Sequence, residues 1–155
     1  MCGFSGVFGF GFQKIRLNKK ILSHRGPDKF SSFQNQFGKI HFWRLSIVDE
    51  NRGNQPFKKN NVVLFFNGEI YNYKYLKYLY LQNDNFKSFS DTEVILNLYL
   101  KFGTKCFDLL EGMFSIVIID ERLNKLILAR DVTGVKPIYY SIKNKMINFS
   151  SEIKG

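Results

Sequence analysis

The chain has 155 residues, of which 45% are hydrophobic and 23% charged. A chain of this length fits one domain, which buries roughly 70% of the surface that its unfolded form exposes, and the composition excludes a disordered or fibrous protein. The 23 Lys and Arg residues outnumber the 13 Asp and Glu residues, which gives a formal net charge of +10. They are scattered in short pairs such as Lys19-Lys20, so they do not form the basic stripe that predicts nucleic-acid binding.

Cysteine content and apolar runs limit the setting of the protein. The two cysteines, Cys2 and Cys106, form neither a disulfide framework nor a C-x-x-C zinc spacing, which favours the reducing cytoplasm. The apolar runs Val62–Phe66 and Phe114–Ile119 are shorter than the ~20 residues that cross a bilayer. No basic region precedes the apolar N-terminus as in an export signal, so we expect a soluble, cytoplasmic domain.

The first third of the chain predicts strands with one short helix. Glycine and apolar residues interleave over Gly3–Phe12, which indicates a buried strand whose backbone is closely approached. Residues Arg16–Ser23 are a helix candidate that Gly26-Pro27 ends. Two strands and a polar loop are expected next, over Ser31–Phe37, Lys39–Arg44 and Asp49–Asn61.

The middle of the chain predicts a strand and two helices. The apolar run Val62–Asn67 indicates a buried strand that ends in a turn at Asn67-Gly68, and Tyr71–Leu81 is helical in pattern. Ser90 and Glu93 form a capping box in front of a second helical stretch, Val94–Phe102.

The last third predicts a series of antiparallel strands, which are expected over Met113–Asp120, Lys125–Arg130, Ile138–Ser141 and Met146–Ser150. Such strands need cover on both faces. Two apolar-faced sheets with helices outside are the simplest architecture that provides it. No repeat or linker indicates a domain boundary inside the chain.

Cys2 is the first candidate for chemistry. If Met1 is removed, Cys2 carries both a thiol and a free α-amine, whose reference pKa near 8 allows its neutral form to take the thiol proton. The alternatives are a small buried apolar residue or an acylation site. The only histidines, His24 and His41, are not expected to act as a base, because lone histidines are more often structural.

Ten ordered motifs, which together span the chain, resemble the N-terminal glutaminase domain of glutamine-hydrolysing asparagine synthetases. They are MCGFSGVFG (1–9), HRGPD (24–28), RLSIVD (44–49), QP (55–56), FNGEIYNY (66–73), SDTEVIL (90–96), LLEGMF (109–114), LARD (128–131), GVKPIYY (134–140) and SSEIKG (150–155). The resemblance implies the class-II glutamine amidotransferase fold of the N-terminal-nucleophile hydrolases. This α+β fold is a four-layer α/β/β/α sandwich of two mainly antiparallel sheets, here over residues 1–155.

The resemblance also implies a reaction. Cys2 would attack the side-chain amide of L-glutamine, form a γ-glutamyl thioester, and release ammonia and then L-glutamate. No cofactor or metal is implied for this domain.

The same resemblance assigns a role to each matching residue. Asn67 and Gly68 would form the oxyanion hole, although an Asn-Gly step by itself is also common in turns. Arg44 would bind the α-carboxylate of glutamine; otherwise it is a surface arginine at a strand end. Glu69 and Asp91 would bind the α-ammonium group, while Asp91 also suits the dipole at a helix start.

Further residues are expected near the substrate or behind the nucleophile. The segment after Arg44 would hold glutamine, with Ile47 and Val48 acting through their backbone; its members are Leu45, Ser46, Ile47 and Val48. Arg25 is expected behind Cys2 or, equally, as a turn-stabilising arginine. Arg130 and Asp131 are expected to be structural, as a buried ion pair.

The resemblance also concerns what lies outside this chain. Family members continue after the SEIKG segment into an ATP-dependent synthetase domain, which would hold ATP and Mg²⁺ and which this sequence does not contain. Three explanations remain open: a subunit that feeds ammonia to a separate synthetase, a piece of a longer protein, or a stand-alone glutaminase. A catalytically silent module that binds glutamine or docks a synthetase is the alternative. A synthetase partner predicts an exposed apolar patch near the C-terminal strands.

Overall fold

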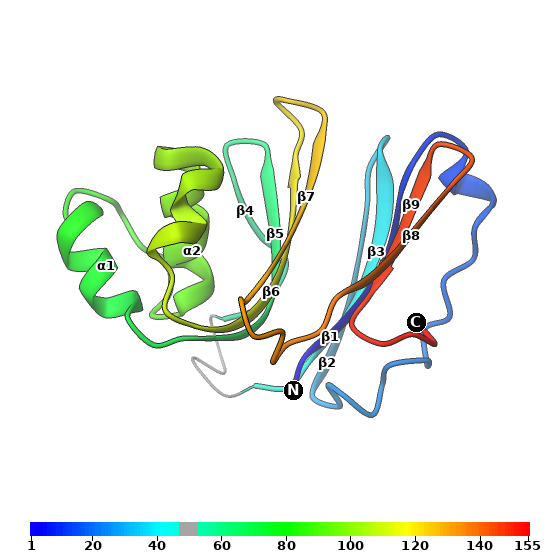
Figure 1. Ribbon diagram of the computed structural model, residues 1–155, viewed down its shortest axis with the longest axis horizontal. Coiled ribbons are helices and arrows are strands. Elements are labelled where there is room, and N and C mark those ends of the chain that lie inside the picture. The colour runs from blue at the N-terminus through cyan, green and yellow to red at the C-terminus, as the bar shows by residue number, and fades with distance from the viewer. Residues whose placement is uncertain (47–52) are drawn as a thin grey trace.

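The computed structural model describes residues 1–46 and 53–155 and consists of two antiparallel sheets that face each other (Figure 1). One sheet has five strands in the order β2-β3-β1-β9-β8, and the other has four in the order β4-β5-β6-β7. The strands of the first are β1 (Gly3–Gly9), β2 (Lys29–Gln34), β3 (Gly38–Arg44), β8 (Tyr139–Lys143) and β9 (Met146–Ser150). Those of the second are β4 (Phe57–Lys59), β5 (Val62–Ile70), β6 (Gly112–Asp120) and β7 (Lys125–Arg130).

An aromatic core joins the two sheets. Phe4 of β1 and Phe42 of β3 are buried against Phe65 of β5 and Val117 of β6, because side chains at alternate positions of each strand point to the same face. β1 lies between β3 and β9, with Phe4 opposite Phe42 and Ser5 opposite Ser150. The predicted pair of apolar-faced sheets is therefore confirmed.

Two helices cover the outer face of the four-stranded sheet (Figure 1). They are α1 (Tyr73–Tyr80) and α2 (Asp91–Phe102), and the 3-10 helix η2 (Gly103–Leu109) follows α2. Ser90 caps α2 as predicted, since its Oγ accepts from the backbone nitrogen of Glu93 at 3.4 Å. The Glu93 carboxylate accepts instead from the backbone of Lys87 and Ser88, so it ties the preceding turn to the helix.

The helix predicted over Arg16–Ser23 is wrong. A 3-10 turn, η1 (Phe12–Lys14), is followed by turns that run along the outer side of the five-stranded sheet (Figure 1). An eight-residue helix is marginal unless tertiary packing supports it. These turns bury Leu22 fully and let the Lys19 carbonyl oxygen accept a hydrogen bond from Trp43 Nε1 at 3.0 Å.

The turn predicted at Asn67-Gly68 is also wrong, because β5 continues through both residues. Asn67 pairs with Ser115 and Gly68 with Phe114 of β6. A Cβ atom on Gly68 would lie 2.1 Å from the carbonyl oxygen of Met113, so this glycine permits close strand pairing. A further strand, β4, lies inside the segment predicted as a polar loop and pairs with β5.

The four strands predicted at the C-terminal end are present but belong to different sheets. β6 and β7 complete the four-stranded sheet, while β8 and β9 return to the five-stranded one. All five residues of β8, which forms the edge of its sheet, are exposed. No helix within the described residues is long and apolar enough to cross a membrane.

Candidate active site

Cys2 lies directly before β1, at the end of the molecule where the two sheets approach each other (Figure 1). Its sulfur lies 3.4 Å from the backbone nitrogen of Leu45, which donates to it, and 3.5 Å from the carbonyl oxygen of the same residue. Burial raises the pKa of the Cys2 thiol. The Leu45 backbone, the terminal amine and the guanidinium groups of Arg44 and Arg25 act in the opposite direction. Burial outweighs these groups, so the net effect is a raised pKa and Cys2 is held as a thiol.

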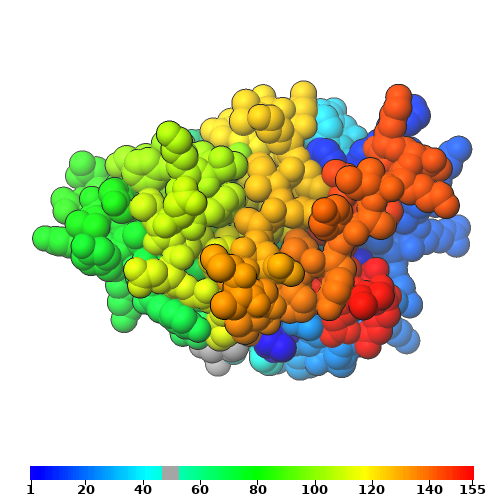
Figure 2. Space-filling view, viewed as in Figure 1, coloured from blue at the N-terminus to red at the C-terminus, as the bar shows by residue number. Residues whose placement is uncertain are grey.

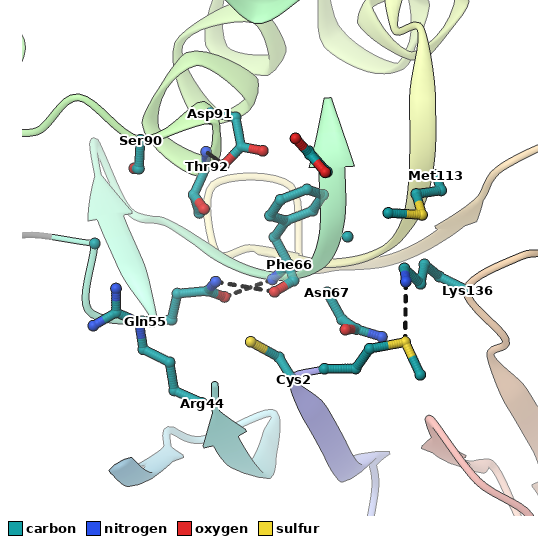
Figure 3. Close-up of a pocket in the computed structure, with 14 residues that line it drawn as sticks. Cys2, Arg44, Gln55, Phe66, Asn67, Ser90, Asp91, Thr92, Met113 and Lys136 are labelled. Atoms are coloured by element: carbon teal, nitrogen blue, oxygen red, sulfur yellow. Dashed lines mark hydrogen bonds between the residues drawn. The ribbon is translucent and has the colours of Figure 1, made fainter. Parts of the chain in front are cut away.

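A pocket opens in front of Cys2 (Figure 3). Cys2 lies on one wall, and Asp91 lies on the opposite wall with Ser90 and Thr92. The pocket is lined by Met1, Cys2, Arg44, Gly53, Gln55, Phe66, Asn67, Gly68, Glu69, Ser90, Asp91, Thr92, Met113 and Lys136. Six of the residues predicted to form the site therefore meet in one cavity, although they come from β3, β5, α2 and the chain start.

The predicted oxyanion hole lies on β5. Asn67 is almost fully buried, and its Nδ2 donates to Ser115 Oγ in a long hydrogen bond of 3.4 Å. Gly68 also lines the pocket, while β5 remains paired with β6 through this residue. The amide of Asn67 and the backbone of Gly68 thus border the same space as the thiol.

Four charged residues line the pocket: Arg44, Glu69, Asp91 and Lys136. Arg44 is buried at the end of β3, and its Nη1 donates to Asn54 Oδ1 at 3.2 Å. Asp91 begins α2 and accepts from the backbone nitrogens of Ile70 at 3.1 Å and Thr92 at 2.8 Å. Burial raises the pKa of Asp91, and the nearby Glu69 carboxylate adds to the effect. An ammonium group placed beside these carboxylates would lower that pKa again.

The segment after Arg44 is only partly described. Leu45 contacts the Cys2 thiol through its backbone, whereas the Ser46 nitrogen donates to Asp28 Oδ2 at 2.7 Å. Neither residue lines the pocket. Ile47 and Val48 lie outside the described residues.

Arg25 lies behind Cys2, as expected. Its Nε donates to the Cys2 carbonyl oxygen at 3.0 Å, and its Nη1 donates to Glu152 Oε1 at 3.0 Å. His24 also contacts Glu152 Oε1, at 2.8 Å, and His41 is buried on the outer face of the five-stranded sheet with Trp43. Neither histidine lines the pocket.

The pocket has further polar residues that were not predicted from the sequence, among them Gln55 and Lys136. Gln55 holds the backbone of Phe66 from both sides, accepting from its nitrogen at 2.6 Å and donating to its oxygen at 2.9 Å. Lys136 is buried, and its Nζ lies 3.0 Å from the sulfur of Met1. Both residues are part of quoted motifs, QP and GVKPIYY, but a motif by itself does not show which side chain turns into a cavity.

The predicted ion pair between Arg130 and Asp131 is wrong. Asp131 is buried and accepts from the backbone nitrogens of Phe114, Val135 and Lys136 at 2.9 to 3.1 Å, whereas Arg130 is exposed. Asp131 therefore orders the loop that carries Lys136. Among the described residues, no group of three His, Cys, Asp or Glu side chains is placed to hold a metal ion.

Comparisons with known proteins agree with this arrangement. The family model for a glutamine amidotransferase domain matches residues 1–155. The chain is 41% identical to asparagine synthetase [glutamine-hydrolyzing] 2 of Bacillus subtilis, and 36% identical to a putative asparagine synthetase [glutamine-hydrolyzing] 2 of Methanocaldococcus jannaschii. Both matches cover the whole chain but only 22% and 35% of those relatives.

A solved structure shows the same fold. The glutamine phosphoribosylpyrophosphate amidotransferase of B. subtilis superposes with a TM-score of 0.74 over 97% of this chain and 42% of that protein, at 23% identity. This likeness confirms the predicted α+β fold with two antiparallel sheets. With the family match over its full length, the chain belongs to the family of glutamine amidotransferase domains.

Proposed function

We propose that this chain, once Met1 is removed, hydrolyses L-glutamine to L-glutamate and ammonia with Cys2 as an N-terminal nucleophile. The observation that carries the proposal is that the Cys2 thiol and the Asn67-Gly68 step border one pocket whose other walls hold Arg44 and Asp91. A free amino acid with a side-chain amide needs these groups: a cation for its carboxylate, an anion for its ammonium, and donors for an oxyanion.

The proposed reaction begins when the α-amine of Cys2 takes the thiol proton and the sulfur attacks the amide carbon. The oxyanion that forms accepts hydrogen bonds from Asn67 Nδ2 and the Gly68 backbone nitrogen. When the C–N bond breaks, the amine returns the proton and ammonia leaves. Water then attacks the thioester, the C–S bond breaks, and glutamate leaves with the thiol restored. Each step uses groups of this chain and water, so no cofactor is required.

Met1 must leave for this chemistry to begin. It lines the pocket, where its sulfur lies 3.0 Å from Lys136 Nζ, and its peptide bond ties up the nitrogen that would act as the base. Removal of Met1 would free both the pocket volume and the amine.

We also propose that the ammonia serves a synthetase domain or subunit. The chain matches only 22% and 35% of the length of these relatives. Exposed apolar side chains gather in the C-terminal third of the chain, where the sequence analysis placed a docking patch; they are Val132, Val135, Tyr140, Ile142 and Ile153. Tyr140 and Ile153 line one pocket beside β8. The C-terminal segment that carries them is orange to red in Figure 2. A cytoplasmic setting is part of the proposal, since both cysteines are free.

The test combines intact mass with turnover. The purified protein with Met1 removed is incubated with L-glutamine, and ammonia and glutamate are measured. Cys2→Ala should abolish both products, whereas Cys106→Ala should keep activity, because Cys106 is buried in the core beside α2. If the trimmed protein binds glutamine but releases no ammonia, a silent binding module replaces the enzyme.

A further inference from the structure

One guanidinium group connects Cys2 to the segment that follows β9. Arg25 Nε donates to the Cys2 carbonyl oxygen, and Arg25 Nη1 donates to Glu152 Oε1, both at 3.0 Å. The Arg25 side chain is only 9% exposed. The Glu152 carboxylate, which is distant in the sequence, is thus connected to the Cys2 backbone through Arg25 alone.

Two glycines make room for this connection. A Cβ atom on Gly3 would lie 3.0 Å from Arg25 Cδ, so the bare backbone of Gly3 lets the arginine pass across β1. A Cβ atom on Gly26 would lie 2.3 Å from the carbonyl group of Trp43, so the loop that carries Arg25 rests directly on β3. The position of Arg25 is therefore set by packing on both sides.

Glu152 is fixed to the same sheet. Ser151 exchanges hydrogen bonds with Phe4 of β1, at 2.9 Å from its nitrogen and 3.0 Å to its Oγ, and the Glu152 nitrogen donates to Ser150 Oγ at 3.3 Å. Burial raises the pKa of Glu152, but hydrogen bonds from His24, Arg25 and Lys154 outweigh it and lower the pKa to about 2. The carboxylate is ionised at neutral pH and offers Arg25 a fixed anion.

We propose that Glu152 is a positioning residue for the nucleophile, which holds Arg25 against the Cys2 carbonyl and so fixes the direction of the Cys2 thiol. The proposal deepens the proposed function, because it rests on Cys2 as the nucleophile. The physical reason is that rotation of the Cys2 peptide would move the sulfur from its place beside Leu45, and misplacement by about 1 Å can cost on the order of a hundredfold in rate.

Lys154, another partner of Glu152, provides a matched control. Lys154 Nζ lies 3.3 Å from Glu152 Oε2, and its side chain is 59% exposed. It shares the carboxylate with Arg25 but, within residues 1–46 and 53–155, makes no hydrogen bond or ion pair with Cys2. Lys154→Ala therefore removes a charge partner of Glu152 but leaves the contacts from Glu152 to Arg25 and from Arg25 to Cys2 intact.

Steady-state kinetics of glutamine hydrolysis form the first test. Glu152→Ala should lower kcat about tenfold to a hundredfold, with KM within about twofold of wild type, because Arg44 and Asp91 lie on other walls of the pocket. Glu152→Gln, which keeps an oxygen for Arg25, should lose less, and Lys154→Ala should stay within about twofold.

A double-mutant cycle decides whether Glu152 acts through Arg25. Arg25→Ala should lower kcat as Glu152→Ala does, and the double variant should lose no more than Arg25→Ala alone. Independent, multiplicative losses would overturn the proposal, as would a loss in Lys154→Ala equal to that in Glu152→Ala.

Alkylation of Cys2 by iodoacetamide, followed by peptide mass, is a readout that needs no turnover. Arg25, Arg44 and the terminal amine lower the pKa of the thiol, and Glu69, Asp91 and Lys136 line the same pocket. If Arg25 moves away in Glu152→Ala, the apparent pKa of alkylation rises, as in Arg25→Ala. A fall would mean that Arg25 stays in place without its anion, which contradicts the proposal. If the wild-type chain hydrolyses no glutamine, the proposed function fails, yet this pKa comparison still decides the role of Glu152.

Discussion

The Cys2 sulfur lies 3.4 Å from the backbone nitrogen of Leu45, the residue that follows Arg44 at the end of β3. The Cys2 thiol is thus held by Leu45, the residue next to the one that carries the pocket's guanidinium group. Since β1 and β3 pair directly, with Gly3 opposite Trp43, their spacing follows from strand register. This relationship makes the separate roles of the two side chains testable.

Arg44→Lys should weaken glutamine binding and spare the chemical step. A lysine keeps the charge but loses the planar fork that holds a carboxylate with two hydrogen bonds. We expect KM to rise about tenfold or more with a smaller change in kcat, measured by ammonia release. Arg16→Lys, at an exposed position, is the control. An unchanged KM would remove Arg44 from the substrate site.

Asn67→Ala should act on the chemical step. Loss of one oxyanion donor typically lowers kcat about 10²- to 10³-fold, and KM should change much less. Asn83→Ala, at an exposed position, serves as the matched control. Equal activity of the two variants would show that the amide of Asn67 does not meet the oxyanion.

His41 should make the fold sensitive to mild acid. It is 1% exposed, and neither ring nitrogen has a hydrogen-bond partner of ordinary geometry among the described residues. Burial lowers the pKa of His41 to about 4, helped by Lys39 and Lys19, and the nearby Asn18 backbone offsets this only in part.

The sign of the effect follows from proton binding. Below pH 6.5 His41 binds a proton in the unfolded chain, whereas in the folded chain it stays neutral until about pH 4. The contribution of neutral His41 to the free energy of unfolding is therefore fully present above pH 6.5 and is lost as the pH falls to 4. Urea unfolding should show His41→Phe losing less stability than wild type over this interval, by up to about 3 kcal/mol. If the free energy of unfolding falls equally with pH in His41→Phe and in wild type, the prediction is contradicted.

Asp131 should stabilise the loop that carries Lys136. Burial raises the pKa of Asp131, but hydrogen bonds from Lys136, Val135, Thr133 and Phe114 outweigh it and lower the pKa to about 2. Its contribution is present above pH 3.8 and is lost as the pH falls through 2.

Asp131→Asn should therefore cost roughly 2 to 3 kcal/mol at pH 7, since hydrogen bonds to a charged acceptor are lost. Chemical denaturation of wild type and variant measures this cost. Asp108→Asn, at an exposed position, should have little effect, and a similarly small change at Asp131 would refute the role.

Much of the local structure could be predicted from the sequence. Apolar alternation placed β6, β7 and β9 within a residue of their observed bounds, and the Ser90 cap identified the start of α2. These features depend on side-chain periodicity and on a hydrogen bond between residues three positions apart. Residues close together in the sequence are therefore enough to predict them. Predictions failed where local pattern and tertiary packing disagreed, as at Gly68, which has turn chemistry but lies inside a paired strand.

The sequence by itself determined which side chains this protein has for chemistry: a cysteine next to the initiator, the Asn67-Gly68 step, and charged residues in motifs of one family. Only the tertiary structure decided which of them meet. The pairing of β1 with β3 and the approach of the two sheets bring Cys2, Asn67 and Asp91 around one pocket, and strand pairing brings Glu152 to Arg25. The physical reason is that these contacts join residues far apart in the chain. They are set by strand register and burial, which act between strands and not along a single strand.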